Sequence, residues 1–127
     1  MIVVDTSALM ALALDEPMAE ACSIALGDNP DALISAATAA EAMIAASRRG
    51  VSREMSSLLD DLEIEVVPLS PADTHRVAAA YRRWGKGFHP AALNFGDCFA
   101  YALAHERGCP LLFVGNDFAR TDVVSAL

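Results

Sequence analysis

Short apolar runs that alternate with helical segments constrain the fold of this chain more than any other feature. The runs fall at Ile2–Val4, Leu33–Ser35, Ile64–Val67 and Leu111–Val114. They are too short for helices, and the first and last are typical of strands buried on both faces of a parallel sheet. Strands that alternate with helices predict an α/β fold, in which a central, mainly parallel sheet of four or five strands lies between helical layers.

Start and stop signals predict where the helices lie. Ser70 and Pro71 are suited to cap and open a helix, and Gly50 and Gly108 are typical of residues that follow one. The segment between residues 85 and 93 is long enough to be a functional loop. No linker or repeat divides the sequence, so we expect one domain over residues 1–127. The expected helices span residues 7–14, 17–26, 36–49, 52–62, 71–84 and 94–107.

The composition favours a protein that is neither exported nor bound to a membrane. No apolar stretch approaches the roughly 20 residues that span a bilayer, and no basic segment precedes the N-terminal run. Three cysteines without a C-x-x-C pair indicate neither a disulfide framework nor a zinc site, so we expect a cytoplasmic protein. The hydrophobic fraction of 54%, much of it alanine in the expected helices, favours tight helix packing and oligomerisation.

Four acidic residues occupy corresponding places in this layout. Asp5 ends the first strand and Glu41 lies on the helix after the second, while Asp97 opens a helix and Asp117 follows the fourth strand. Each acid alone has an ordinary explanation as a helix cap, a turn residue or a solvated position. Glu41 argues most strongly against such a role, because its helical neighbours are almost all apolar or small and offer it no charged partner.

The expected position of these acids favours a bound cation. The carboxyl ends of parallel strands lie at one edge of a sheet, where ligands bind in such folds. If the acids converge there, their repulsion raises their pKa values unless a cation neutralises them. Carboxylate oxygens without Cys or His nearby suit Mg²⁺, with Mn²⁺ as the alternative. A bound cation would also offset part of the net charge of −8. This charge repels nucleic acid unless cations bind or basic residues cluster.

The acids lie in distinctive runs of sequence. These are VVDTSA (Val3–Ala8), NFGDC (Asn94–Cys98) and FVGNDF (Phe113–Phe118), and the segment Tyr81–Gly87 leads through His89 and Pro90 to the second of them. Together with the isolated Glu41, these runs extend over essentially the whole chain. They resemble the PIN-domain ribonucleases, and more narrowly the VapC toxins of bacterial toxin–antitoxin pairs.

This resemblance implies a three-layer α/β/α PIN-like fold and an activity. The chain would be a metal-dependent endoribonuclease that hydrolyses RNA phosphodiester bonds with metal-activated water, and a cognate VapB-like antitoxin would inhibit it. Asp5, Glu41 and Asp97 match the core acids of the family as catalytic and metal-binding residues, and Asp117 is the best match to a fourth. The resemblance also implies a second copy of the toxin as a partner.

Other residues would support these acids. Thr6 or Ser7 would orient Asp5 or bind a metal-coordinated water. Asn116 stands where many relatives carry a second acid, and Asp122 lies near enough to assist. The full set of expected supporting residues is Thr6, Ser7, Asn94, Asn116, Thr121 and Asp122.

Two clusters of basic residues are candidates to contact RNA. They are Arg48, Arg49 and Arg53 around one helix end, and Arg82, Arg83 and Lys86 around another. Because basic residues follow phosphates while aromatic rings stack on bases, the second cluster, which alternates with Tyr81 and Trp84, is the better candidate. An ordinary explanation carries comparable weight, since cations are favoured at helix C-termini and both aromatic residues can pack in the core.

Two other functions compete with the nuclease. A receiver-like phosphoacceptor domain also has an acidic pocket on a parallel sheet, but it needs paired acids after the first strand and a lysine after the last. The single lysine of this chain, Lys86, lies elsewhere. A non-catalytic PIN-like module that binds RNA or protein would have the same fold. Retention of the core acids argues against that module, and metal-dependent RNA cleavage separates the two.

Overall fold

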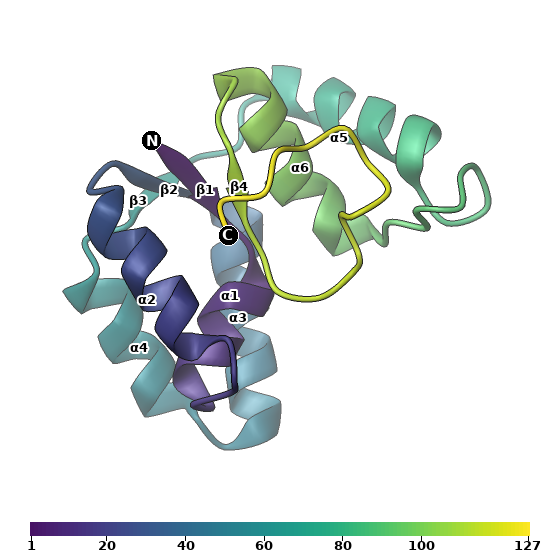
Figure 1. The fold of residues 1–127 in the computed structure, drawn as a ribbon. Helices are drawn as coiled ribbons and strands as arrows, with labels where there is room; N and C mark the ends of the chain where they lie inside the picture. Colours follow the sequence, from purple (N-terminus) through teal and green to yellow (C-terminus); the bar gives the residue numbers. More distant parts are fainter.

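A computed structural model of residues 1–127 contains one central sheet of four strands, all parallel, in the order β3-β2-β1-β4 (Figure 1). The parallel sheet expected from the apolar runs is therefore confirmed. The edge strand β3 is the most exposed of the four, with Glu65 and Val66 open to solvent. The strands are β1 (Ile2–Val4), β2 (Ala32–Ser35), β3 (Glu65–Val67) and β4 (Leu111–Leu112).

Six helices cover the two faces of this sheet. In Figure 1 the helices α1 to α4 form one layer and the helices α5 and α6 form the other, which confirms the three-layer α/β/α architecture. None of these helices is both long enough and apolar enough to cross a bilayer. Their bounds are α1 (Thr6–Ala13), α2 (Ala19–Asp28), α3 (Ala36–Arg49), α4 (Ser52–Asp61), α5 (Pro71–Trp84) and α6 (Phe95–Arg107).

Alternation along the strands builds two separate hydrophobic cores. Side chains of successive strand residues point to opposite faces of a sheet. Ile2 and Val4 of β1 accordingly pack with the helices α1 to α4, whereas Val3, between them, packs with α5 and α6. The same division separates Ile34 from Leu33 in β2. The sheet is thus buried on both sides, and polar side chains gather where its strands end.

The strand order places a crevice at the carboxyl end of β1. From β1 the chain adds β2 and then β3 on one side, and it returns to place β4 on the other side of β1. Such a reversal of direction opens a crevice beyond the strand ends, where α/β proteins bind ligands. Asp5 follows β1 at this point and begins α1.

The expected boundaries differ from the structure by two residues at β4 and α2 and by at most one residue elsewhere. The run Leu111–Val114 forms a strand over only its first two residues, because the backbone N–H of Val114 donates to Oγ of Ser7 at 3.0 Å instead of to a neighbouring strand. The helix expected to open at Pro17 begins at Ala19, after a turn. The end of the chain returns to the sheet through a bridge between Leu111 and Ser125.

Candidate active site

The four predicted acids line one open depression of about 520 Å³ at the carboxyl end of β1. They come from the end of β1, from α3, from the first turn of α6 and from the loop after β4. The structure thereby brings together residues that lie more than 100 positions apart in the sequence. The lining consists of Asp5, Thr6, Ser7, Met10, Glu41, Ile44, Ala45, Arg48, Arg49, Asp97 and Asp117.

Asp5 is held through one carboxylate oxygen and free at the other. It caps α1, with Oδ2 accepting hydrogen bonds from the backbone N–H of Ser7 at 3.0 Å and from its hydroxyl at 2.7 Å. Only 4% of the residue is exposed, and its Oδ1 is buried without a hydrogen-bond partner. A buried carboxylate oxygen without a partner is costly, and a bound cation removes that cost.

Glu41 is fixed by a residue of another helix. Its Oε1 accepts a hydrogen bond of 2.6 Å from the hydroxyl of Thr6, which opens α1. The carboxylate lies close to Gly96, in the first turn of α6. Glu41 is half-buried and forms no ion pair, so the isolated acid of the apolar helix faces a polar pocket shared by three helices.

Asp97 combines a structural role with a place in the pocket. It forms a capping box with Asn94: its Oδ2 accepts from the backbone N–H of Asn94 at 3.0 Å, and its own N–H donates to the Asn94 side chain at 2.8 Å. This explains Asn94, which supports Asp97 and lies outside the pocket lining. Oδ2 makes the one hydrogen bond of this carboxylate, which leaves Oδ1 available to a ligand.

Burial and mutual repulsion shift the pKa values of these acids upward. Burial raises the pKa of Asp97 to about 6, and the charges of Asp5, Asp117 and Glu41 add to the increase. The pKa of Asp5 is also raised, chiefly by burial and further by Glu41, although the hydrogen bonds from Ser7 oppose the change. Burial, with a smaller effect from Asp97, raises the pKa of the adjacent Cys98 to about 11, so this thiol is not a nucleophile at neutral pH.

The donor set fits a hard divalent cation that keeps part of its water shell. No group of three or more acidic, His or Cys side chains is placed to hold a metal ion by itself. Mg²⁺ is commonly bound through one or two carboxylates and several waters, and this pocket is open enough to admit them. The unpartnered Oδ1 of Asp5 and the free Oδ1 of Asp97 are the two oxygens best suited to such an ion.

The fourth acid and its neighbours separate in space. Asp117 is exposed and lines the depression, whereas Asn116 and Thr121 do not line it. Thr121 donates to the carbonyl of Phe118 at 2.8 Å and stabilises a turn. Asp122 accepts a hydrogen bond of 2.5 Å from the hydroxyl of Tyr101 and pairs with Arg83 at 3.4 Å. Asp122 does not line the depression, and its assistance to the acids stays a prediction.

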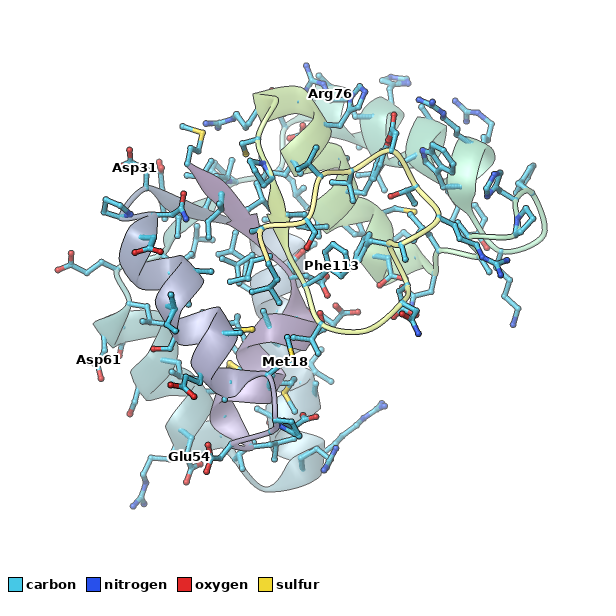
Figure 2. The ribbon with its side chains drawn as sticks, in the orientation of Figure 1. Met18, Asp31, Glu54, Asp61, Arg76 and Phe113 are labelled. Carbon is cyan, nitrogen blue, oxygen red and sulfur yellow. The ribbon has the colours of Figure 1, made fainter.

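The basic residues at the pocket are Arg48 and Arg49, at the end of α3. The other cluster, preferred on sequence grounds, lies outside the lining: Arg83 stacks on the buried Trp84 with 4.6 Å between its guanidinium carbon and the ring centroid. Trp84 therefore packs in the core, whereas Tyr81 is only partly buried. Many acidic residues also lie outside the pocket. Figure 2 shows two of them, Asp31 and Asp61, projecting from the surface of the molecule.

Sequence reasoning overlooked three residues at the site. Met10 and Ile44 form an apolar wall of the depression, and a periodicity argument assigns such residues to a core. Gly96 was noted only as part of the run NFGDC, although a glycine at an expected helical position is informative by itself. Glycine is unfavourable inside a helix unless another group approaches the backbone closely.

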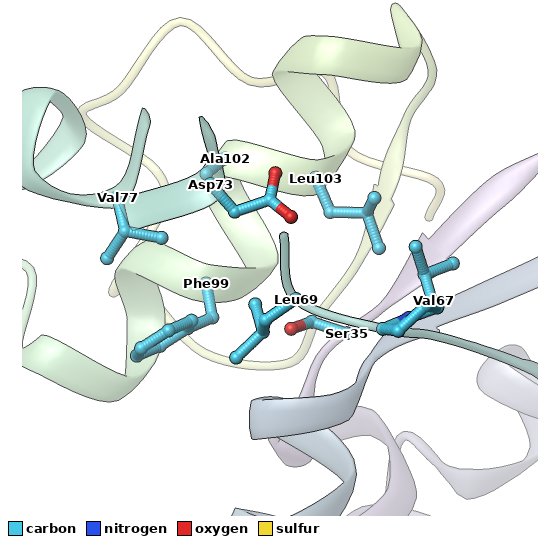
Figure 3. A pocket seen from close by; sticks show the side chains of 9 residues that line it. Ser35, Val67, Leu69, Asp73, Val77, Phe99, Ala102 and Leu103 are labelled. Atoms are coloured by element: carbon cyan, nitrogen blue, oxygen red, sulfur yellow. The ribbon is translucent and has the colours of Figure 1, made fainter. Parts of the chain in front are cut away.

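A second pocket does not have the features of a catalytic site. It lies between the ends of β2 and β3 and the helices α5 and α6 (Figure 3). Its volume of about 20 Å³ holds roughly one water molecule. Figure 3 shows Val77, Phe99 and Leu103 around it. Its one carboxylate, Asp73, accepts from the backbone of Ser70 and pairs with Arg76.

Comparisons with known proteins agree with this geometry. A family model described as the PIN domain matches residues 2–124. The chain is 44% identical over 126 residues to Ribonuclease VapC of Mycolicibacterium smegmatis, an alignment that covers 97% of this chain and 98% of that protein. It is 41% identical over 126 residues to Ribonuclease VapC30 of Mycobacterium tuberculosis, covering 97% of this chain and 96% of that one.

A solved structure shares the fold at low sequence identity. The crystal structure of Mycobacterium tuberculosis VapC20, a toxin that cleaves the sarcin–ricin loop, superimposes with a TM-score of 0.79 at 16% identity, covering 98% of this chain and 97% of that one. Family model, relatives and fold thus agree over nearly the whole length. The chain therefore belongs to the PIN-domain family and, within it, to the VapC ribonucleases.

Proposed function

We propose that this chain is a metal-dependent endoribonuclease toxin that hydrolyses RNA phosphodiester bonds, with Mg²⁺ as its cation and Mn²⁺ as the alternative. The observation that carries the proposal is the buried, unpartnered Oδ1 of Asp5 in a pocket that also contains Glu41, Asp97 and Asp117. Membership of the VapC ribonucleases supports RNA as the substrate.

Each residue of the pocket has a distinct part in this proposal. Asp5 and Asp97 hold the cation, and Ser7 keeps Oδ2 of Asp5 engaged so that Oδ1 is left for the ion. A divalent cation supplies Lewis-acid chemistry: it lowers the pKa of a bound water and stabilises negative charge at the phosphate. Oε1 of Glu41 is held by Thr6, so its other oxygen, Oε2, is the atom that binds the attacking water or accepts its proton.

Arg48 and Arg49 supply the positive charge that an acidic protein needs at this site. They lie at the C-terminal end of α3, two turns beyond Glu41, on the rim of the same depression. We assign them to the phosphates that flank the cleaved bond, because guanidinium groups bind phosphate oxygens in a bidentate manner. The cluster of Arg82, Arg83 and Lys86 lies outside this pocket.

The substitution Asp5→Asn tests the activity. Asparagine caps helices as well as aspartate does, so α1 and the contacts from Ser7 remain while the negative charge is lost. We expect cleavage of a structured RNA in Mg²⁺ to fall by about 100-fold or more, since metal-ion catalysis accounts for several kcal/mol. Electrophoresis of the products, with and without EDTA, measures the rate.

A matched control is Asp31→Asn, which removes the same charge from an exposed residue far from the pocket. We expect this variant to cleave as the wild type does. Full metal-dependent cleavage by Asp5→Asn would contradict the proposal. Binding of RNA without cleavage by the wild type would favour the alternative, a non-catalytic PIN-like module that binds RNA or protein.

The partners and location of the protein are further proposals. A VapB-like antitoxin is supported by a toxin–antitoxin complex from Klebsiella pneumoniae that shares the fold, with a TM-score of 0.73, 22% identity and coverage of 100% of this chain and 98% of that one. Loss of cleavage when the product of the neighbouring gene is added tests this partner. A cytoplasmic location is supported by three free cysteines, two of them buried. A homodimer is supported by exposed phenyl rings at the start of α6 and in the loop before it.

A further inference from the structure

Gly96 is a glycine at a helical position whose backbone does not require one. It is the second residue of α6, between Phe95 and Asp97, and its φ angle is not positive. Glycine inside a helix costs about 0.5 to 1 kcal/mol relative to alanine, because its backbone loses more freedom on folding. The missing side chain at this position therefore needs an explanation other than backbone conformation.

The explanation lies in the space above the Gly96 Cα. A Cβ atom built there would overlap Oε2 of Glu41, and it would lie 2.9 Å from Cδ and 3.3 Å from Oε1 of the same residue. On its other side, Glu41 accepts the 2.6 Å hydrogen bond from the Thr6 hydroxyl. The carboxylate thus lies between the hydroxyl of Thr6 on α1 and the bare backbone of Gly96 on α6.

The atoms that a new side chain would meet are the end of a flexible side chain. Gly85 provides the contrast, because a Cβ there would collide with the backbone carbonyl of Tyr81 and crowd its ring. A backbone obstacle cannot move without disturbing the fold, whereas a glutamate can adopt another rotamer. A methyl group at position 96 is therefore expected to displace the carboxylate while the helices stay in place.

We propose that Gly96 is a positioning residue whose lack of a side chain places the Glu41 carboxylate against Thr6 and beside Asp97. This inference rests on the proposed function. It holds that Gly96, which has no side chain, determines the position of the Glu41 carboxylate. Two adjacent residues of α6 then serve the site in different ways. Asp97 supplies a carboxylate, and Gly96 leaves room for the Glu41 carboxylate of α3.

The test compares Gly96→Ala with Gly27→Ala. Gly27 also lies inside a helix without a positive φ, and nothing lies within 4 Å of a Cβ built there. We expect both variants to unfold at or above the temperature of the wild type. We expect RNA cleavage to fall by about 10- to 100-fold in Gly96→Ala alone, because small displacements of a catalytic group have effects of that size.

A double-mutant cycle shows whether Gly96 acts through Glu41. In a Glu41→Ala background the carboxylate is absent, so we expect the added Gly96→Ala change to alter the remaining cleavage rate by less than about twofold. A further loss of similar size in both backgrounds would overturn the inference. If Gly96→Ala does not fold, recovery of folding in the double variant supports the collision with Glu41, and failure of both to fold contradicts it.

A readout that does not depend on activity separates this inference from the proposed function. The ¹³C chemical shift of the Glu41 carboxyl carbon, measured in EDTA, reports whether the Thr6 hydrogen bond persists. We expect the signal to move in Gly96→Ala and to stay in place in Gly27→Ala. An unmoved signal overturns the placement of Glu41 by Gly96. A wild-type protein that does not cleave RNA, yet shows the expected movement, contradicts only the nuclease.

Discussion

Asp97 shows how one residue serves both the fold and the site. Its Oδ2 completes the capping box that begins α6, and the same carboxylate lies 8% exposed in a pocket with three other acids. The helix start thus determines where the acid lies. The consequence of placing a carboxylate there is a raised pKa, because burial disfavours the charged form and the neighbouring acids repel it.

The metal-free protein should lose stability as the pH rises through the range in which Asp97 ionises. Its pKa is about 6 in the folded protein, against an ordinary value of 3.8. The folded state therefore holds this proton more tightly. The stability that the proton confers is complete below pH 3.8 and is lost as the pH rises through about 6.

Urea unfolding in EDTA between pH 4 and about pH 7 measures this effect. We expect the decline in the free energy of unfolding to be smaller in Asp97→Asn, because asparagine carries no ionisable proton and keeps the capping geometry. Asp31→Asn, at an exposed position, should follow the wild type. Identical profiles for the wild type and Asp97→Asn would contradict the prediction.

At the scale of elements, an irregular segment carries the fourth acid. The C-terminal segment, residues 113–127, has little regular structure and passes in front of α6 in Figure 1. Beyond Asp117 it is fixed by side chains as well as by its bridge to Leu111. Phe118 is buried and lies 5.1 Å from Phe113 between ring centroids. Asp122 accepts the hydrogen bond from Tyr101, whose hydroxyl oxygen in turn accepts from Nε1 of Trp84 at 2.9 Å.

Removal of the Tyr101 hydroxyl should destabilise the protein by about 1–3 kcal/mol. Tyr101→Phe keeps the ring in the core but leaves the buried Trp84 N–H and the Asp122 carboxylate without this partner. Urea unfolding measures the change. Tyr81→Phe is the control, because the Tyr81 hydroxyl makes only an exposed, 3.3 Å contact, and its effect should stay within about 0.5 kcal/mol. Equal effects of the two substitutions would contradict the assignment.

Sequence signals located those elements whose ends depend on nearby residues. Gly50 follows α3 in a left-handed conformation, and Ser70 with Asp73 forms the capping box of α5, as local spacing predicted. The end of β4 was not predicted because the backbone N–H of Val114 donates to the hydroxyl of Ser7, which lies 107 positions away in the sequence. Contacts of that kind depend on how the chain folds back on itself.

The same limit applies to the candidate site. Asp5, Asp97 and Asp117 could be predicted because each follows a strand or begins a helix at the same edge of the sheet, and Glu41 because it is the isolated acid of an apolar helix. Which arginines lie beside them could not, since that depends on the packing of α3 across the sheet edge. The position of Asp122 depends on Tyr101, which is distant in sequence. Composition alone does not predict which contacts form between residues that are distant in sequence.

At the scale of the whole molecule, two phenyl rings are left in solvent. Phe88 is 63% exposed and Phe95 is 69% exposed, and they flank a largely apolar depression of about 470 Å³ that Tyr81 and Phe99 also line. Apolar area of this kind on one face is typical of a protein interface. It supports the proposed homodimer, in which a second copy of the chain covers this face.

Replacing Phe95 should shift the protein toward the monomer. Phe95→Ser removes about 2 kcal/mol or more of apolar burial from each side of the proposed interface, while the exposed position limits its effect on folding. Sedimentation equilibrium measures the change. Ile24→Ser, at a 57% exposed residue of α2, serves as the control and should leave the assembly unchanged. A monomeric wild type, or an unchanged dimer in Phe95→Ser, would contradict the prediction.

The division of the acids between the two ends of the chain affects when activity arises during synthesis. Asp5 and Glu41 are made early, whereas Asp97 belongs to the last helix and Asp117 to the segment after the last strand. Strand β4, an edge strand that pairs with β1, is also made late. A nascent chain that stalls before this point contains only half of the acids. The four acids are therefore present together only after residue 117 has been synthesised.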